Sequence, residues 1–106
     1  MNITSDLIRG HTETIILSQL CGKDSYGYEI NKAIMEQTGN RYELKEATLY
    51  SAFRRLEQSG LILSYWGDET TGARRRYYSI TPLGHTVYEQ NKKEWQEAKE
   101  IIDKLI

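Results

Sequence analysis

Arginine side chains gather at two places in the second half of this chain, and their chemistry suits contact with an anionic polymer. Arg54 and Arg55 lie in a segment with helical periodicity, and Arg74, Arg75 and Arg76 follow after a turn-rich stretch. Guanidinium groups donate to phosphate oxygens and to base edges, so both clusters are candidates for nucleic-acid contact. Enzyme chemistry has little support, because His11 and His85 stand singly and the sequence holds no metal-ligand spacing, nucleophile elbow or phosphate loop. We therefore predict a protein that is not an enzyme and that uses no metal or cofactor.

The first arginine cluster belongs to a helix predicted over residues 46–60. At about 100° per residue, Leu49, Ala52, Phe53 and Leu56 form one apolar stripe that can face a core. The opposite face carries small, polar and cationic groups, which suit the floor of a DNA major groove, although solvated helix faces have the same composition. The candidate DNA contacts of this helix and the residue before it are Lys45, Thr48, Tyr50, Ser51, Arg54 and Arg55.

The second cluster belongs to a predicted hairpin that follows the helix stop at Gly60. Residues 61–66 and 74–80 are rich in β-branched, aromatic and aliphatic residues, and residues 67–72 have turn chemistry. Neighbouring residues in a strand point to opposite faces, so one core cannot use Arg74, Arg75 and Arg76 together. Phosphate contact explains all three, and an edge strand protected by charge is the alternative. Ile80 and Tyr78 are expected on the inward face, with Tyr77 on the other.

Two further helices are predicted before residue 46. The first covers residues 6–21 and stops at Gly22, and the second begins after Ser25 as N-cap and stops at Gly39. Lys45 then occupies the N-cap position of the helix over residues 46–60, where Ser, Asp or Asn is usual. Three helices followed by a hairpin predict a winged helix-turn-helix domain over residues 1–80. The expected fold class is mainly α with a small β-hairpin (α+β).

Composition places this chain among single-domain proteins of ordinary size. It has 106 residues, of which 39% are hydrophobic, and a formal net charge of −1. Residues 41–80 nevertheless hold seven cations against five anions, a net charge of +2, so the positive charge is local. A single cysteine, Cys21, excludes an internal disulfide and is expected to be a small buried hydrophobe. With no signal peptide or membrane span recognised, we expect a cytoplasmic protein.

Residues 81–106 predict one long helix, which we treat as a second unit that follows the winged domain. Twenty-four helical residues would extend about 36 Å, which exceeds what an 80-residue domain can cover. Heptads counted from Tyr88 place Tyr88, Asn91, Trp95, Ala98, Ile102 and Leu105 at a and d positions. We infer a dimerisation helix, with its return onto its own domain as the alternative. The predicted interface residues, including two from the first helix, where Gly10 marks a close helix contact, are Leu7, Gly10, Tyr88, Trp95, Ala98, Ile102 and Leu105.

Several short runs along the chain resemble one family of bacterial repressors. They are Tyr26-Gly27-Tyr28-Glu29-Ile30, Ala47-Thr48-Leu49-Tyr50, Arg55-Leu56-Glu57, Gly60-Leu61-Ile62, and Arg74 to Thr81 followed by Gly84. In this order and spacing they resemble the PadR family of transcriptional regulators over nearly the whole chain. The short single-helix tail with a central tryptophan is similar to the small subfamily that includes lactococcal multidrug-resistance repressors.

The resemblance implies a homodimer in which paired tryptophans line a flat pore that admits planar aromatic compounds. Carried over to this chain, Trp95 stacks on the ligand, and the implied ligand-binding residues are Leu7, Asn91, Lys92, Trp95, Lys99 and Ile102. Because Lys92 and Lys99 are the nearby charges, we predict a preference for neutral or anionic compounds, unless Glu13 compensates.

The expected function is that of a homodimeric repressor on a pseudo-palindromic double-stranded operator, relieved by such a ligand. Its half-sites would lie about one helical turn apart, roughly 34 Å. The alternative is a winged-helix module that binds other proteins without sequence-specific DNA binding.

Overall fold

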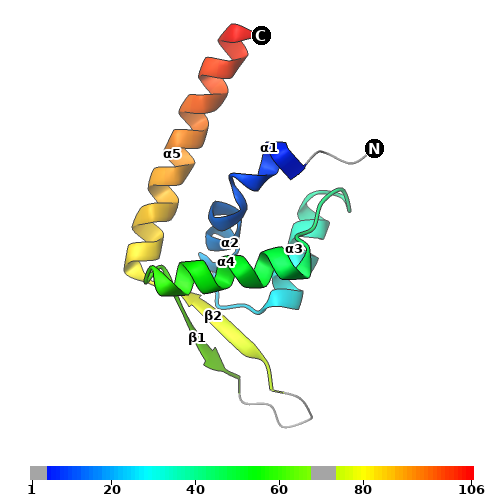
Figure 1. The fold of residues 1–106 in the computed structure, drawn as a ribbon, viewed down its shortest axis with the longest axis vertical. Helices are drawn as coiled ribbons and strands as arrows, with labels where there is room; N and C mark the ends of the chain where they lie inside the picture. The colour runs from blue at the N-terminus through cyan, green and yellow to red at the C-terminus, as the bar shows by residue number, and fades with distance from the viewer. Residues whose placement is uncertain (1–4, 68–73) are drawn as a thin grey trace.

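Helices make up most of the fold, and one antiparallel hairpin projects from them (Figure 1). The computed structural model describes residues 5–67 and 74–106. Its elements are α1 (Ser5–Arg9), α2 (Thr12–Leu20), α3 (Gly27–Gln37), α4 (Glu46–Gln58), β1 (Ile62–Trp66), β2 (Arg76–Ile80) and α5 (Pro82–Leu105). This order confirms the predicted fold class and the winged helix-turn-helix arrangement. Among the described residues, no helix is both long enough and apolar enough to cross a membrane.

The core lies where α2, α3, α4 and the root of the hairpin meet. The predicted stripe of α4, Leu49, Ala52, Phe53 and Leu56, is buried. The Phe53 ring stacks on that of Tyr78 with 3.8 Å between centroids and 15° between planes. The remaining buried apolar residues come from the other elements and the loops between them: Ile16, Leu17, Leu20, Ile30, Ile34, Leu44, Leu61 and Ile62. The core therefore fixes α4 from one side only and leaves its opposite face to solvent.

The helix predicted over residues 6–21 is wrong, because the structure has two helices there. The chain leaves the helix at Gly10 and His11, and α2 begins at Thr12. The Thr12 hydroxyl donates to the Arg9 carbonyl at 3.1 Å and stabilises this break. A Cβ at Gly10 would meet nothing within 4 Å, so Gly10 makes no close helix contact within the chain.

The predicted N-cap at Ser25 is also wrong. Helix α3 begins at Gly27 with Tyr26 as N-cap, and Ser25 forms an antiparallel bridge to Tyr78 instead. The two backbone hydrogen bonds of this bridge measure 3.1 and 2.8 Å. The loop before α3 thus extends the sheet edge, and the Ser25 hydroxyl donates to the side chain of Glu29 in the first turn of α3. Lys45 is the N-cap of α4, as predicted, and makes no side-chain capping bond.

The hairpin pairs Ile62 with Ile80 and Trp66 with Arg76 at its two ends. As predicted, Tyr78 is buried and Ile80 packs on the same core, while Tyr77 faces the other side. The second strand is shorter than the predicted 74–80, because Arg74 and Arg75 precede it. Most of the predicted turn, residues 68–72, lies outside the described residues.

A tight joint connects the end of α4, the start of β1 and the start of α5. The Thr81 hydroxyl accepts from the Gly84 amide at 3.0 Å and donates to the Gly60 carbonyl at 2.7 Å. A Cβ on Gly84 would overlap the carbonyl oxygen of Leu61, so α5 sits directly on the chain at this point. Gly60 has a φ of 75°, which glycine adopts without strain.

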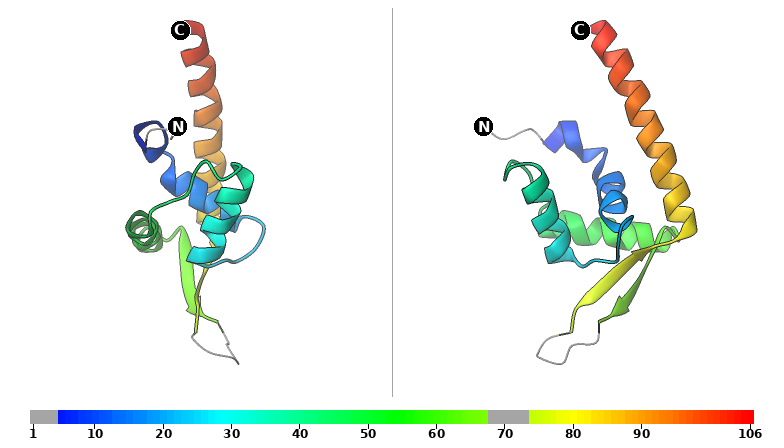
Figure 2. Two further views of the ribbon diagram at one scale, coloured as in Figure 1. Left: turned by 90° about the vertical axis from the view of Figure 1, so that its right-hand side faces the viewer. Right: turned by 180° about the vertical axis from the view of Figure 1, so that it is seen from behind.

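Helix α5 packs on α2 near its start and then extends past the other helices (Figures 1 and 2). Tyr88 packs against the core and Asn91 donates to the Thr14 hydroxyl at 2.9 Å. From Lys99 to Ile106 every residue is exposed. The alternative of a return onto the same domain therefore describes α5 as far as Trp95, which contacts His11, and not the last two turns.

Candidate nucleic-acid interface

The outward face of α4 carries most of the DNA contacts predicted from the sequence. Lys45, Thr48 and Arg54 are exposed. Tyr50 is 43% exposed, and its ring meets the Phe53 ring edge-on at 5.6 Å. A Cβ on Gly27 would come within 2.7 Å of the Tyr50 hydroxyl oxygen, so the Tyr50 side chain packs closely against the first residue of α3.

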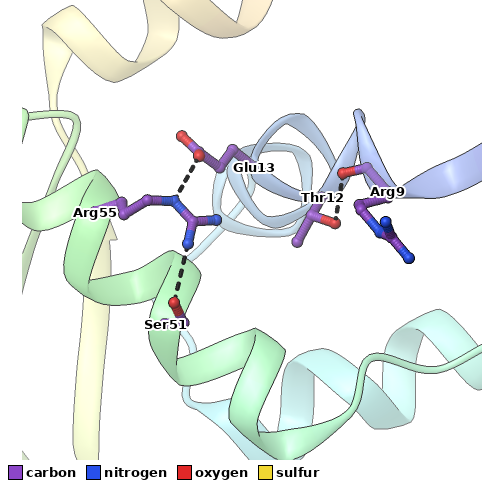
Figure 3. A network of polar contacts seen from close by, with 5 residues as sticks. All are labelled: Arg9, Thr12, Glu13, Ser51 and Arg55. Carbon is purple, nitrogen blue, oxygen red and sulfur yellow. Dashed lines mark hydrogen bonds and ion pairs between the residues drawn. The ribbon is translucent and has the colours of Figure 1, made fainter. Parts of the chain in front are cut away.

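Arg55 differs from Arg54 because it is tied to other residues of the chain (Figure 3). Its Nε donates to Glu13 Oε2 at 3.0 Å, and its Nη1 donates to the Ser51 hydroxyl at 2.9 Å. The pair joins α4 to α2 and offsets the positive charge on this flank of the helix. Arg55 and Ser51 were both predicted to contact DNA. Glu13 was not predicted as the partner of Arg55, because no spacing rule relates residues so far apart in the chain.

The hairpin of β1 and β2, together with Arg74 and Arg75 before β2, is called the wing below. Two of its three arginines lie around one tryptophan. The guanidinium carbons of Arg74 and Arg76 lie 5.3 and 5.8 Å from the Trp66 ring centroid. Arg76 also donates to the Ser64 hydroxyl at 2.8 Å and lies 3.6 Å from a carboxylate oxygen of Glu57 in α4. The charge of Arg76 is therefore partly offset by Glu57 of α4, the helix predicted to enter the DNA groove and called the recognition helix below. This pairing was not predicted from the sequence.

The third wing arginine lies among tyrosines beside the loop before α3. The Arg75 guanidinium carbon is 4.9 Å from the Tyr26 ring centroid, and the Tyr26 ring meets Tyr77 edge-on at 5.3 Å. Tyr77 in turn stacks on Tyr65 at 5.7 Å, and the Tyr65 hydroxyl donates to Asp24. This hydrogen bond raises the pKa of the Tyr65 phenol above its usual value, so the phenol stays a donor. We call Tyr26, Tyr65, Tyr77 and Arg75 the wing-root cluster.

Acidic side chains mark the part of this surface that a phosphate backbone would avoid. An open groove runs between α3 and the start of α4, and Glu36, Glu43 and Glu46 are among its lining residues. These three carboxylates outnumber Lys32, which lines the same groove, so a phosphate backbone would be repelled there relative to Arg54 and the wing. This charge distribution is compatible with a duplex lying along α4 and the hairpin.

The predicted ligand residue Trp95 lies on α5 at the level of the break between α1 and α2. Its side chain is 41% exposed, and its ring meets the His11 ring edge-on at 4.7 Å. Lys99 Nζ lies 5.7 Å from the ring centroid, as expected of a nearby cation. His11 was not predicted as a neighbour of Trp95, although a continuous helix places it on the same face as Leu7, which was.

The other predicted ligand residues do not form one group in the single chain. Asn91 binds Thr14, Lys92 lies over the Tyr88 ring at 5.9 Å, and Leu7 and Ile102 are 70% and 49% exposed. Glu13 is engaged by Arg55. Among the described residues, His11 and Lys99 are the side chains recorded against the Trp95 ring.

Cys21 is half-buried, not fully buried as predicted. Its Sγ lies 3.3 Å from the Leu17 carbonyl oxygen and 3.9 Å from Nδ1 of His85. Burial, and secondarily the charge of Glu89, raise the pKa of this thiol. The described residues contain no group of three or more His, Cys, Asp or Glu side chains able to hold a metal. Cys21 and His85 thus form a contact between the end of α2 and the start of α5.

Known proteins share this arrangement. A transcriptional regulator from Clostridium thermocellum is 54% identical and superposes with a TM-score of 0.90, covering 98% of both chains. A PadR family transcription regulator from Clostridium difficile is 39% identical, with a TM-score of 0.80 over 91% of this chain and 98% of the other. An uncharacterized protein of Lysinibacillus sphaericus is 50% identical over 101 residues, which are 95% of this chain and 93% of that one.

The profile of the transcriptional regulator PadR-like family matches residues 16–90, which include α3, α4 and the described part of the hairpin. The recognition helix, the arginine-bearing wing and the relatives agree on one class of protein, which is not a class of enzymes. This chain belongs to the PadR-like family of DNA-binding transcriptional regulators.

Proposed function

We propose that this regulator acts as a homodimer in which residues 1–80 bind DNA and residues 81–106 join the two protomers. The observation that carries the proposal is the distal part of α5, where Ile101, Ile102, Leu105 and Ile106 are 58%, 49%, 75% and 101% exposed. Apolar side chains on successive turns of a helix that leaves its own domain need a partner helix. A second copy supplies an identical surface, as in most soluble oligomers.

The dimer places two recognition helices and two wings on one face of a pseudo-palindromic operator, in the cytoplasm. Their contacts are Lys45, Thr48, Tyr50, Ser51, Arg54, Arg55, Arg74, Arg75 and Arg76. Arg54 is the candidate for base contact, because it is exposed on α4 and no described acid is paired with it. Arg55 and Arg76 contribute less to affinity, because Glu13 and Glu57 offset their charges.

The same dimer forms a ligand site around Trp95 that relieves repression, as in the multidrug-binding subfamily. Two exposed Trp95 rings can face each other across the interface, with Leu7, Asn91, Lys92, Lys99 and Ile102 around them. Lys99 lies over the ring, and Glu13 is held by Arg55, so Coulomb repulsion disfavours cationic compounds. Neutral or anionic planar compounds are therefore the expected ligands. A ligand shifts the dimer between DNA-binding states only by its difference in affinity for them.

Selection of bound fragments from random DNA tests the DNA-binding proposal. We expect enrichment of a pseudo-palindrome with half-sites about one helical turn apart. Retention of no duplex at low or moderate salt would favour a protein-interaction module instead. Repeating the selection with planar compounds, while following Trp95 fluorescence in a Trp66→Phe background, tests the ligand site. Stronger quenching by cationic than by anionic dyes would contradict the proposed charge preference.

A further inference from the structure

Aromatic side chains of the wing-root cluster pack the hairpin against the loop before α3. Tyr26, the N-cap of α3, touches both Tyr77 and Arg75, and its neighbour Ser25 pairs with β2 through the backbone. The cluster therefore connects the hairpin to the helix-turn-helix independently of α4. Tyr26 is the member whose ring lies under the Arg75 guanidinium.

We propose that Tyr26 is a positioning residue that holds Arg75 in place for phosphate contact. The flat guanidinium of Arg75 lies 4.9 Å from the Tyr26 centroid, a cation–π distance. Arginine side chains lose considerable rotamer entropy when they bind, and a stacked guanidinium has lost part of it already. Tyr26 itself is fixed by the edge-on Tyr77 ring, which packs so closely on Gly67 that a Cβ there would overlap it.

Arg75 and Arg76 have supports of different chemistry. The Arg76 guanidinium lies 3.6 Å from a carboxylate oxygen of Glu57, whereas the Arg75 guanidinium lies over the Tyr26 ring. The inference rests on the proposed function, because it takes Arg75 as a DNA contact.

A double-mutant cycle on Tyr26 and Arg75 tests the inference with the full-length chain. The variants are Tyr26→Leu, Arg75→Ala and the double variant, and the probe is a labelled short duplex of mixed sequence titrated at several salt concentrations. Arg75→Ala should weaken binding and reduce the salt slope by about one. Tyr26→Leu should weaken binding about two- to fivefold, and the double variant should bind no more weakly than Arg75→Ala alone.

Two controls separate positioning from general damage to the domain. Tyr42→Leu removes another half-buried tyrosine ring that packs on the core away from the wing, and it should leave DNA affinity unchanged. Tyr26→Phe keeps the ring and should bind as the parent does. Successive fluorination of a phenylalanine at position 26 withdraws charge from the ring face at nearly constant shape, so affinity should fall stepwise even if Tyr26→Leu does not fold.

The outcomes that contradict the proposal differ from those that contradict the proposed function. Unchanged affinity and salt slope in Arg75→Ala would remove Arg75 from the proposed DNA interface, and the inference with it. A loss in Arg75→Ala with no loss in Tyr26→Leu, or with additive losses in the double variant, would leave Arg75 as a DNA contact and exclude positioning by Tyr26. A flat fluorination series would exclude it as well.

Discussion

The DNA-binding end of the molecule and the far end of α5 differ in how far contacts within the same chain occupy their side chains. At the DNA-binding end, Arg55, Arg75 and Arg76 each have a support from the same chain: Glu13, the Tyr26 ring and Glu57 respectively. At the far end, Ile102 and Leu105 are exposed and every residue from Lys99 onward faces solvent. Contacts within one chain thus hold these arginines in place, whereas a second copy would cover the end of α5 in the proposed dimer.

The largest expected effect comes from charging the exposed end of α5. Ile102→Glu combined with Leu105→Glu places like charges in the proposed seam, so we expect monomers and an affinity for the selected operator lower by on the order of 100-fold. Sedimentation velocity and operator titration measure the two effects. Gln90→Glu adds negative charge to an exposed position nearer the start of α5 and should change neither. A double variant that stays dimeric would show that this end of α5 is not the seam.

The joint between the two regions should show the next effect, on stability. Gly84→Ala forces a methyl group against the Leu61 carbonyl, and we expect a cost of about 1–3 kcal/mol in the free energy of unfolding. Urea denaturation measures this cost. Gly22→Ala is the matched control, because a Cβ there would meet nothing within 4 Å. Equal stability of the two variants would mean that α5 is not tightly seated on β1.

Arg54 and Arg55 provide a matched pair within one helix. Arg54→Ala should reduce discrimination between operator and mixed DNA by about 1–3 kcal/mol, the usual value of a good base contact. Arg55→Ala should weaken binding to both duplexes by less than about 1 kcal/mol, the value of an exposed ion pair. The effect is small because Glu13 already offsets the charge of Arg55. Competition titrations with the two duplexes measure both. If Arg55→Ala has the larger effect on discrimination, the assignment of the two arginines must be reversed.

The smallest expected effect concerns Cys21, which lies where α2 meets α5. Its raised pKa lowers the thiolate fraction at a given pH, so alkylation by iodoacetamide should be slower than for the unfolded chain. The midpoint of the pH–rate profile should lie above the ordinary cysteine value. Reaction at the unfolded rate near neutral pH would show that the α2–α5 contact opens readily.

Local patterns in the sequence predicted the parts of the fold that follow a period. The apolar stripe of α4 and the alternation of Tyr77 and Tyr78 were both found in this way, because burial repeats with the geometry of helix and strand. The break at Gly10 was missed, because the apolar spacing continues across it. Ser25 was wrongly predicted as the N-cap, because a serine just before a helix is usual at an N-cap, and its backbone bridge to Tyr78 leaves no signal in the local sequence.

Contacts between distant residues could not be predicted in this way. Glu13 with Arg55, and Tyr26 with Arg75, depend on how α2, α3, α4 and the wing pack, and neither pair has a sequence signature. The arginines were singled out by residue type alone, and their differing environments follow from tertiary structure. This is why the predicted list treated Arg54 and Arg55 alike.

The joint at Thr81 and Gly84 couples the direction of α5 to the position of the recognition helix α4. The Thr81 hydroxyl, which caps α5, also donates to the Gly60 carbonyl just beyond α4, so the start of α5 is attached to the end of α4. With a helix about 36 Å long, a turn of about 10° at the joint moves its far end by roughly 6 Å. In a dimer held at that end, the movement appears instead as a change in the distance between the two α4 helices. Small adjustments near Trp95 would then select among operators by the length of their spacers.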